Sequence, residues 1–284
     1  MTVLDIFTSR ELALIIWLAI TLVYMLIVKS TRKALINVIE AFLEIRILIP
    51  FSVMLIYTGF IVFILKNIGF ENRDLVKDSI FWFFGTAIIL FINVNDFANG
   101  KKSFKKVITE NFAFVAILFF VNNSFPHEFW IEFLTIPFAF VIVCLGVVAN
   151  SDEKYKPVKK LIDYVFIIIA VVTICSITNS ILNNLREVAS LDTLKNFLAP
   201  VILTTTFVPF MYFLSLYLVY GRFFARSNIM LKYDKELTRF IQRRVLLLCD
   251  VNLAKILKFE DENFRSLGQI KSKEDVLNQV NGFD

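Results

Sequence analysis

Polar side chains recur on one face of an otherwise apolar segment in the second half of the chain. In and just beyond residues 161–182 they are spaced three or four residues apart: Thr173, Ser176, Ser180, Asn183 and Glu187. That spacing places them on one stripe of a helix. In a membrane, such a stripe lines a water-filled pathway or forms hydrogen bonds to neighbouring helices. The sequence leaves both interpretations open.

The next apolar segment, residues 197–220, carries a second group of polar residues. Thr204 and Thr205 lie between Pro200 and Pro209. Threonine hydroxyls can bond to backbone carbonyls that a proline leaves unpaired. The pattern predicts either a simple proline kink or a bend that shapes a pathway beside the polar stripe.

An acidic pair precedes and opens the apolar segment 129–149. Glu128 and Glu132 are one helical turn apart. In an oligomer they would form an acidic ring at the outer mouth of a pore, which attracts cations. The alternative is that both carboxylates are solvated at the membrane interface.

A basic helix face is predicted near residue 240. It consists of Lys232, Lys235, Arg239, Arg243 and Arg244. Such a face suits anionic lipid headgroups or a nucleotide or oligonucleotide on the cytosolic side. Acidic residues nearby nearly balance its charge.

Signals for enzymatic chemistry are sparse. The chain has one histidine and no spacing typical of a zinc, dinucleotide, P-loop or serine-hydrolase site. We therefore expect no catalytic residue, metal or cofactor, with a membrane-embedded enzyme as the alternative.

The elements that position these groups are predicted to be membrane helices. Of the 284 residues, 57% are hydrophobic and 19% are charged, and the mean hydropathy is +0.70. Soluble domains are less apolar and more charged. A spanning helix needs about 20 mostly apolar residues. Seven segments qualify, at 11–28, 47–65, 80–94, 107–121, 129–149, 161–182 and 197–220.

The basic residues between these segments predict the topology. Lysine and arginine concentrate in the first, third and fifth loops and directly after the last segment. Cytoplasmic loops are enriched in these residues. The pattern favours seven crossings, with the N-terminus outside and the C-terminus in the cytoplasm.

Of two further polar segments, one lies within the predicted transmembrane domain of residues 1–221 and the other follows it. In residues 30–46, the polar residues Lys33, Asn37, Glu40 and Glu44 recur at steps of three and four, with apolar residues on the other side. This pattern predicts an amphipathic helix, which either lies in the interface or continues the first span. Residues 222–284 form a charged helical tail, with one long helix expected over 235–259. Ser272 and Asp275 fit a capping box. A tail of this size is too small to be very stable alone, so it should pack on cytosolic loops or on neighbouring subunits.

In layout, several spans followed by a small charged tail, the chain resembles the membrane effectors of bacterial anti-phage systems, such as the Hailong-type effector. The resemblance implies a tetrameric ion channel that is regulated by a nucleic-acid oligomer, made by a partner nucleotidyltransferase. It concerns architecture and carries over no binding residue.

The sequence thus predicts an all-α polytopic bundle in a cell membrane, most simply the bacterial inner membrane. It predicts a homo-oligomeric channel or pore-forming effector acting in antiviral defence. The alternatives are a small transporter or lipid-handling protein and a non-conducting membrane anchor or assembly subunit.

Overall fold

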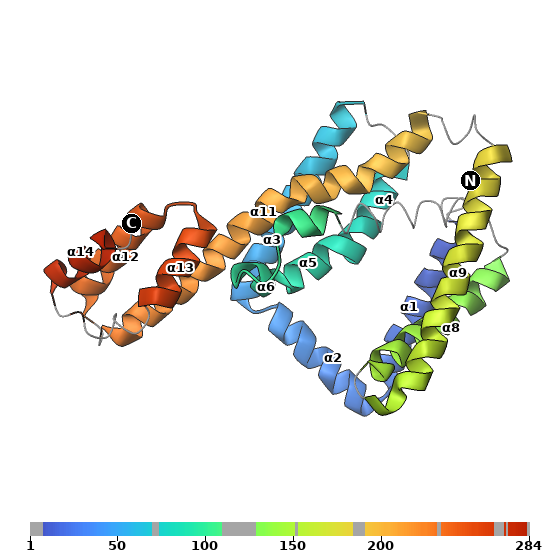
Figure 1. Ribbon diagram of the computed structural model, residues 1–284, viewed down its shortest axis with the longest axis horizontal. Helices are drawn as coiled ribbons and strands as arrows, with labels where there is room; N and C mark the ends of the chain where they lie inside the picture. The colour runs from blue at the N-terminus through green and yellow to red at the C-terminus, as the bar shows by residue number, and fades with distance from the viewer. Residues whose placement is uncertain are drawn as a thin grey trace. The chain divides into compact units, whose positions relative to one another are not determined.

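The structure is a computed structural model that describes residues 8–69, 74–109, 129–150, 153–183, 191–231, 234–263, 270 and 272–282. All regular structure in these residues is helical, with 12 α-helices (Figure 1). The helices are α1 Ser9–Ile27, α2 Lys29–Phe42, α3 Ile45–Asn67, α4 Asp74–Trp82, α5 Ile88–Ile92, α6 Val94–Ala98, α8 Phe129–Ala149, α9 Lys156–Asn183, α11 Leu191–Met230, α12 Lys235–Cys249, α13 Leu253–Asn263 and α14 Lys273–Asn281. The all-α prediction is confirmed for the described part of the chain.

The chain divides into two compact units. The first contains residues 1–49 and 116–194, and the second contains residues 50–115 and 195–284. Each unit therefore joins segments that are far apart in the sequence.

In the first unit, α1 packs on α8, which packs in turn on α9 (Figure 1). Helix α1 begins with a capping box, in which Thr8 Oγ1 accepts from the N–H of Glu11 and the Glu11 carboxylate accepts from the N–H of Thr8. The indole of Trp17 stacks on Phe133 with 5.1 Å between ring centroids, and its Nε1 donates to the Phe133 carbonyl at 2.8 Å. One aromatic side chain thus supplies both packing and a directed bond between the two helices.

The amphipathic segment forms a separate helix. The backbone leaves the helical region at Val28 and α2 follows, with no buried residue in its length. The hydroxyl of Thr31 donates to the carbonyls of Met25 and Val28, at 3.1 and 3.0 Å, and so bonds the start of α2 to the last turn of α1. Of the two expectations for this segment, continuation of the first span is wrong.

In the second unit, α3, α4, the π-helical residues Phe83–Ala87 and α11 share a core. Its most deeply buried members come from α3, the π-helical stretch and α11: Met54, Ala87, Leu203, Phe207 and Met211. The edge of the Trp82 ring faces Phe207, with 5.5 Å between centroids. Aromatic and aliphatic side chains therefore fill this core together.

Four helices in the described residues are long and apolar enough to cross a membrane, which indicates a multi-pass membrane protein. They are Ser9–Ile27, Ile45–Asn67, Phe129–Ala149 and the stretch Leu198–Met230 of α11. The expected number was seven, so the count is lower than predicted.

The three remaining predicted spans explain the difference. The third, 80–94, lies in a helical stretch that changes from α to π geometry at Phe83, returns to α geometry at Ile88 and ends at Ile92, so it contains no single α-helix of spanning length. The fourth, 107–121, falls mostly outside the described residues. The sixth, 161–182, lies within α9, several side chains of which are also outside the described set.

The tail helices gather around the C-terminal end of α11 (Figure 1). The inner face of α12 buries Leu237, Ile241, Val245 and Cys249 at four-residue steps. These side chains share a core with Val219, Tyr220 and Phe223 of α11 and with Ala98, and Phe104 packs against it. The small tail thus packs on the predicted third cytosolic loop and on the last predicted span.

The expected long helix over 235–259 is wrong, because the chain breaks at Asp250. That residue has φ +45°, and α13 starts three residues later, at Leu253. The Asn252 side chain accepts from the N–H of Lys255 and caps the new helix. The expected capping box at Ser272 and Asp275 is confirmed at the start of α14.

Candidate functional site

The predicted polar stripe falls on the C-terminal half of α9. Thr173, Ser176, Ser180 and Asn183 belong to this helix, but their side chains lie outside what the structure describes, as does the whole of Glu187. The assignment of these residues to a pathway stays a prediction.

Thr204 and Thr205 have different surroundings on α11. Thr204 is buried, accepts from Trp82 Nε1 at 2.8 Å and donates to the Pro200 carbonyl at 2.8 Å. Thr205 is exposed and donates to the Val201 carbonyl at 2.8 Å. The hydroxyl of Thr204 is therefore engaged between α4 and α11.

The part of α11 that contains its two prolines makes further polar contacts. Pro209 has no N–H to donate to the carbonyl of Thr205, four residues earlier. The adjacent Thr206 carbonyl accepts from Tyr57 Oη of α3 at 2.7 Å, and the Thr206 hydroxyl donates to the Ile202 carbonyl at 2.7 Å. These contacts satisfy backbone acceptors in a region where water is scarce.

Only one residue of the predicted acidic pair lies in the described part of the chain. Glu128 is outside the described residues. Glu132 is buried and forms a two-pronged ion pair with Arg10 of α1, at 2.8 and 3.0 Å. Such bidentate pairing fixes the two helices against each other.

The predicted basic face lies on the outer surface of α12. Lys235, Arg239, Arg243 and Arg244 are exposed, and Lys232 is outside the described residues. The Arg244 guanidinium lies 5.3 Å from the centroid of the Phe240 ring. The structure thus places the four described basic side chains on one accessible helix.

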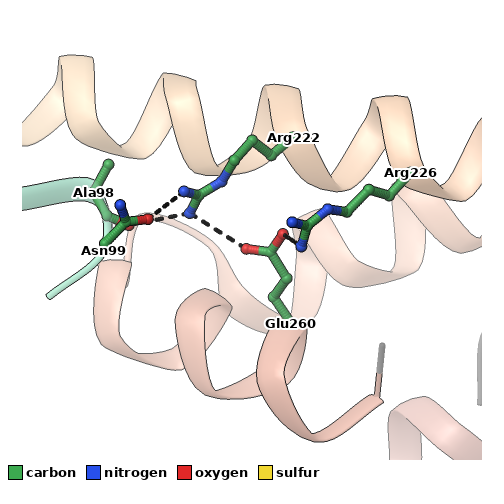
Figure 2. A network of polar contacts seen from close by, with 5 residues as sticks. All are labelled: Ala98, Asn99, Arg222, Arg226 and Glu260. Atoms are coloured by element: carbon green, nitrogen blue, oxygen red, sulfur yellow. Dashed lines mark hydrogen bonds and ion pairs between the residues drawn. The ribbon is translucent and has the colours of Figure 1, made fainter. Parts of the chain in front are cut away.

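The most developed polar site is a junction between α11 and the tail, shown in Figure 2. Arg226 Nη1 donates to Glu260 Oε1 at 2.5 Å, and Arg222 Nη2 donates to Glu260 Oε2 at 3.4 Å. Arg222 also donates to the Asn99 side chain and, at 3.1 Å, to the Ala98 carbonyl. We call these side chains, Asn99, Arg222, Arg226 and Glu260, the arginine junction.

The arginine junction follows from the helical spacing of its members. Arg222 and Arg226 are four residues apart and share one face of α11. Glu260 is only 6% exposed, beside the buried Phe259 of α13. A carboxylate this deeply buried requires ionic partners, and the two guanidinium groups provide them.

Two tyrosines of α11 bind the turn between α12 and α13. Tyr220 Oη donates to the Asp250 carbonyl at 2.7 Å, and Tyr212 Oη donates to the Val251 carbonyl at 2.5 Å. Tyr212 Oη also accepts from the N–H of Leu253 at 3.1 Å. The tyrosines thus hold the backbone that would otherwise lack partners at the helix break.

Sequence reasoning missed the arginine junction and the two tyrosines. In the sequence, Arg222 and Arg226 are basic residues after the last apolar segment, which indicate only topology, and Glu260 is one of the acidic residues of the tail. The spacing of the two arginines was a usable signal. No sequence pattern, however, pairs Arg226 and Arg222 with a glutamate 34 and 38 residues later in the chain.

The arrangement can couple a movement of the tail to a movement of α11. Within the described ranges, no group of three histidine, cysteine or acidic side chains could hold a metal ion. The junction instead joins α6, α11 and α13 through one carboxylate and two guanidinium groups. Displacing α13 would break these bonds, so the position of the tail and that of the end of α11 depend on each other.

No protein-family model, curated protein or solved structure compared with the chain matches it. The likeness in layout to anti-phage effectors therefore stays a hypothesis.

Proposed function

We propose that this protein is a homo-oligomeric channel or pore-forming effector of the bacterial inner membrane, controlled through its C-terminal tail. The apolar helices form the conducting part. The tail helices α12, α13 and α14 receive a signal and pass it to α11.

One observation carries this proposal. Helix α11 is continuous from the start of its apolar stretch at Leu198 to its end at Met230. The tail helices pack on the C-terminal part of this same helix. The arginine junction and the two tyrosines attach α13 and its preceding turn to the same helix. A movement of the tail would therefore reach a membrane helix directly, as gating by a ligand requires.

The topology in this proposal has seven crossings, with the N-terminus outside. The four apolar helices are joined by α9 and by segments 80–94 and 107–121. The alternation of basic loops supports this arrangement. Alkaline phosphatase fused after Asp284 should be inactive, since that enzyme matures only outside the cytoplasm, and an active fusion would contradict the topology.

The signal in this proposal is a nucleotide or an oligonucleotide, in line with the resemblance to anti-phage effectors. Exposed lysines of the tail, among them Lys235 on α12 and Lys258 on α13, would contribute the cationic surface that a phosphate backbone needs. Defence against phage is the biological role that this reading implies.

Ion flux from liposomes tests the proposal. Full-length protein is reconstituted, and potassium release is measured for the natural sequence, for Glu260→Gln and for Glu262→Gln. Loosening the arginine junction should change flux per folded protein by at least several-fold. The exposed Glu262, on the same helix, pairs with Lys258 at 3.9 Å and should change it little.

The alternatives give different results in the same experiment. A transporter or lipid-handling protein would show saturable, solute-specific uptake by a monomer. A membrane anchor would show no flux in any variant. A monomer in detergent would overturn the proposal of a channel. So would the absence of flux in every variant and with every added oligonucleotide.

A further inference from the structure

The outer face of α12 places cationic and apolar side chains next to each other. Arg239, Arg243 and Arg244 are exposed along this helix. Within the described residues, none of the three has an ion pair with an acidic side chain. One turn further on, Leu247 is 77% exposed, and Val251 in the following turn is 54% exposed.

This exposed apolar cluster, Leu246, Leu247 and Val251, is unusual for a tail that is otherwise charged. The inner face of α12 already fills its core with Leu237, Ile241, Val245 and Cys249. The outer leucines and the valine are therefore not needed for packing within the tail. Exposed apolar groups bordered by positive charge are typical of helices that lie on anionic membranes.

The position of the exposed apolar cluster along the axis of α11 agrees with contact to a membrane. The turn that carries Val251 is bonded to Tyr212 and Tyr220. Both tyrosines precede Arg222, the first charged residue after the apolar stretch of α11. At 1.5 Å per residue, Tyr212 lies about 15 Å from Arg222 along the helix axis. The turn therefore lies beside the apolar part of α11.

We propose that the outer face of α12 docks on the anionic lipid headgroups of the leaflet from which α11 emerges. This inference rests on the proposed membrane position of α11. Leu246, Leu247 and Val251 reach the boundary between headgroups and acyl chains, and the three arginines bind lipid phosphates. Asp250, in the same turn, is exposed and keeps the insertion shallow.

The three arginines and the exposed apolar cluster together favour an anionic lipid surface as the partner. A basic helix face near a membrane gains affinity from each cation because anionic lipids give the surface a negative potential. An apolar cluster beside it gains from leaving water at a depth of about 5–10 Å. A soluble polyanion would engage the arginines and leave Leu247 and Val251 in water.

Spin labels on the full-length protein in nanodiscs test the proposal. The background replaces the native cysteines with alanine: Cys144, Cys175 and Cys249. A nitroxide is attached through Leu247→Cys, and through Glu274→Cys on α14 as an aqueous control. Collision with oxygen and with a nickel chelate is compared in neutral phosphatidylcholine discs and in discs that also contain phosphatidylglycerol.

The expected result depends on the lipid. In the anionic discs the label at position 247 becomes accessible to oxygen and protected from nickel, while the label at position 274 stays accessible to nickel. Replacing Arg239, Arg243 and Arg244 with glutamine should lower the docked-to-undocked ratio about five-fold per residue. Replacing them with lysine keeps the charge and should preserve docking.

Other outcomes overturn the proposal. Nickel access at position 247 in anionic discs means that the face does not touch lipid. Protection that is equal in neutral discs, with broadening between labels, identifies a second copy of the chain. Binding of a fluorescent single-stranded DNA that needs the arginines, while position 247 stays in water, assigns the face to nucleic acid.

Flux measured on the same variants separates this inference from the proposed function. Flux without lipid docking overturns only the docking. Docking without flux in any variant overturns only the channel.

Discussion

Replacing Glu260 with glutamine should loosen the attachment of the tail to α11. The change keeps the size of the side chain and one carbonyl oxygen as an acceptor, but it removes the negative charge. Arg222 and Arg226 then lose the carboxylate that both contact, at 3.4 and 2.5 Å.

The magnitude follows from burial and geometry. A hydrogen bond to a charged group contributes about 1.5–3 kcal/mol, and the bond to Arg226 is short. The Arg222 and Arg226 side chains are 32% and 45% exposed, so water replaces part of the lost interaction. We expect the free energy of opening the tail to fall by about 1–2 kcal/mol.

Hydrogen–deuterium exchange of the peptide that contains α13 measures this opening directly. A loss of 1–2 kcal/mol corresponds to exchange that is about 5- to 30-fold faster. Glu262→Gln is the matched control. It lies on the same helix in an exposed pair with Lys258, where the expected change is about 0.5 kcal/mol or less.

The comparison of the two variants decides the result. Equal exchange of α13 in Glu260→Gln and Glu262→Gln would refute the argument that the arginine junction attaches the tail. A double-mutant cycle with Arg226→Gln adds a second check. If Glu260 acts through Arg226, the effects of the two changes should not add.

Three further predictions concern helix α11, the tail helix α12 and helix α9. Thr204→Val leaves the buried indole N–H of Trp82 without its acceptor and should lower stability by about 0.6–2 kcal/mol, measured as a lower melting temperature in detergent. Burial raises the pKa of Cys249 to about 11, so its thiolate is scarce at neutral pH. Maleimide labelling of Cys249, followed by mass spectrometry, should therefore be slow at pH 7.5 and accelerate as pH rises toward 11. Ser176→Leu with Ser180→Leu should reduce ion flux if the stripe lines water. Unchanged flux per folded protein with a lowered melting temperature would instead assign the stripe to helix–helix bonding.

Composition and short-range patterning determined the class of this protein. Long apolar segments can place their side chains only in lipid or in a core, which made membrane helices the expected solution. Four helices of the described chain fit that expectation. Capping at Ser272 was also readable, because a capping box involves residues only three apart.

Tertiary structure decided where the helical geometry changes and where a helix ends. Segment 80–94 has the hydropathy of a span, but a π-helical stretch follows Trp82, which bonds to Thr204 across the core. The break at Asp250 likewise depends on tyrosines about 30 and 39 residues earlier in the chain. Hydropathy and local propensity carry no information about such distant partners.

The arginine junction likewise could be recognised only from the tertiary structure. Sequence spacing put Arg222 and Arg226 on one helix face, but their role emerged only when α13 brought Glu260 between them. Glu132, read as part of an acidic mouth, proved to be bonded to Arg10. A charge in a sequence has no fixed partner, and burial together with the nearest opposite charge decides what it does.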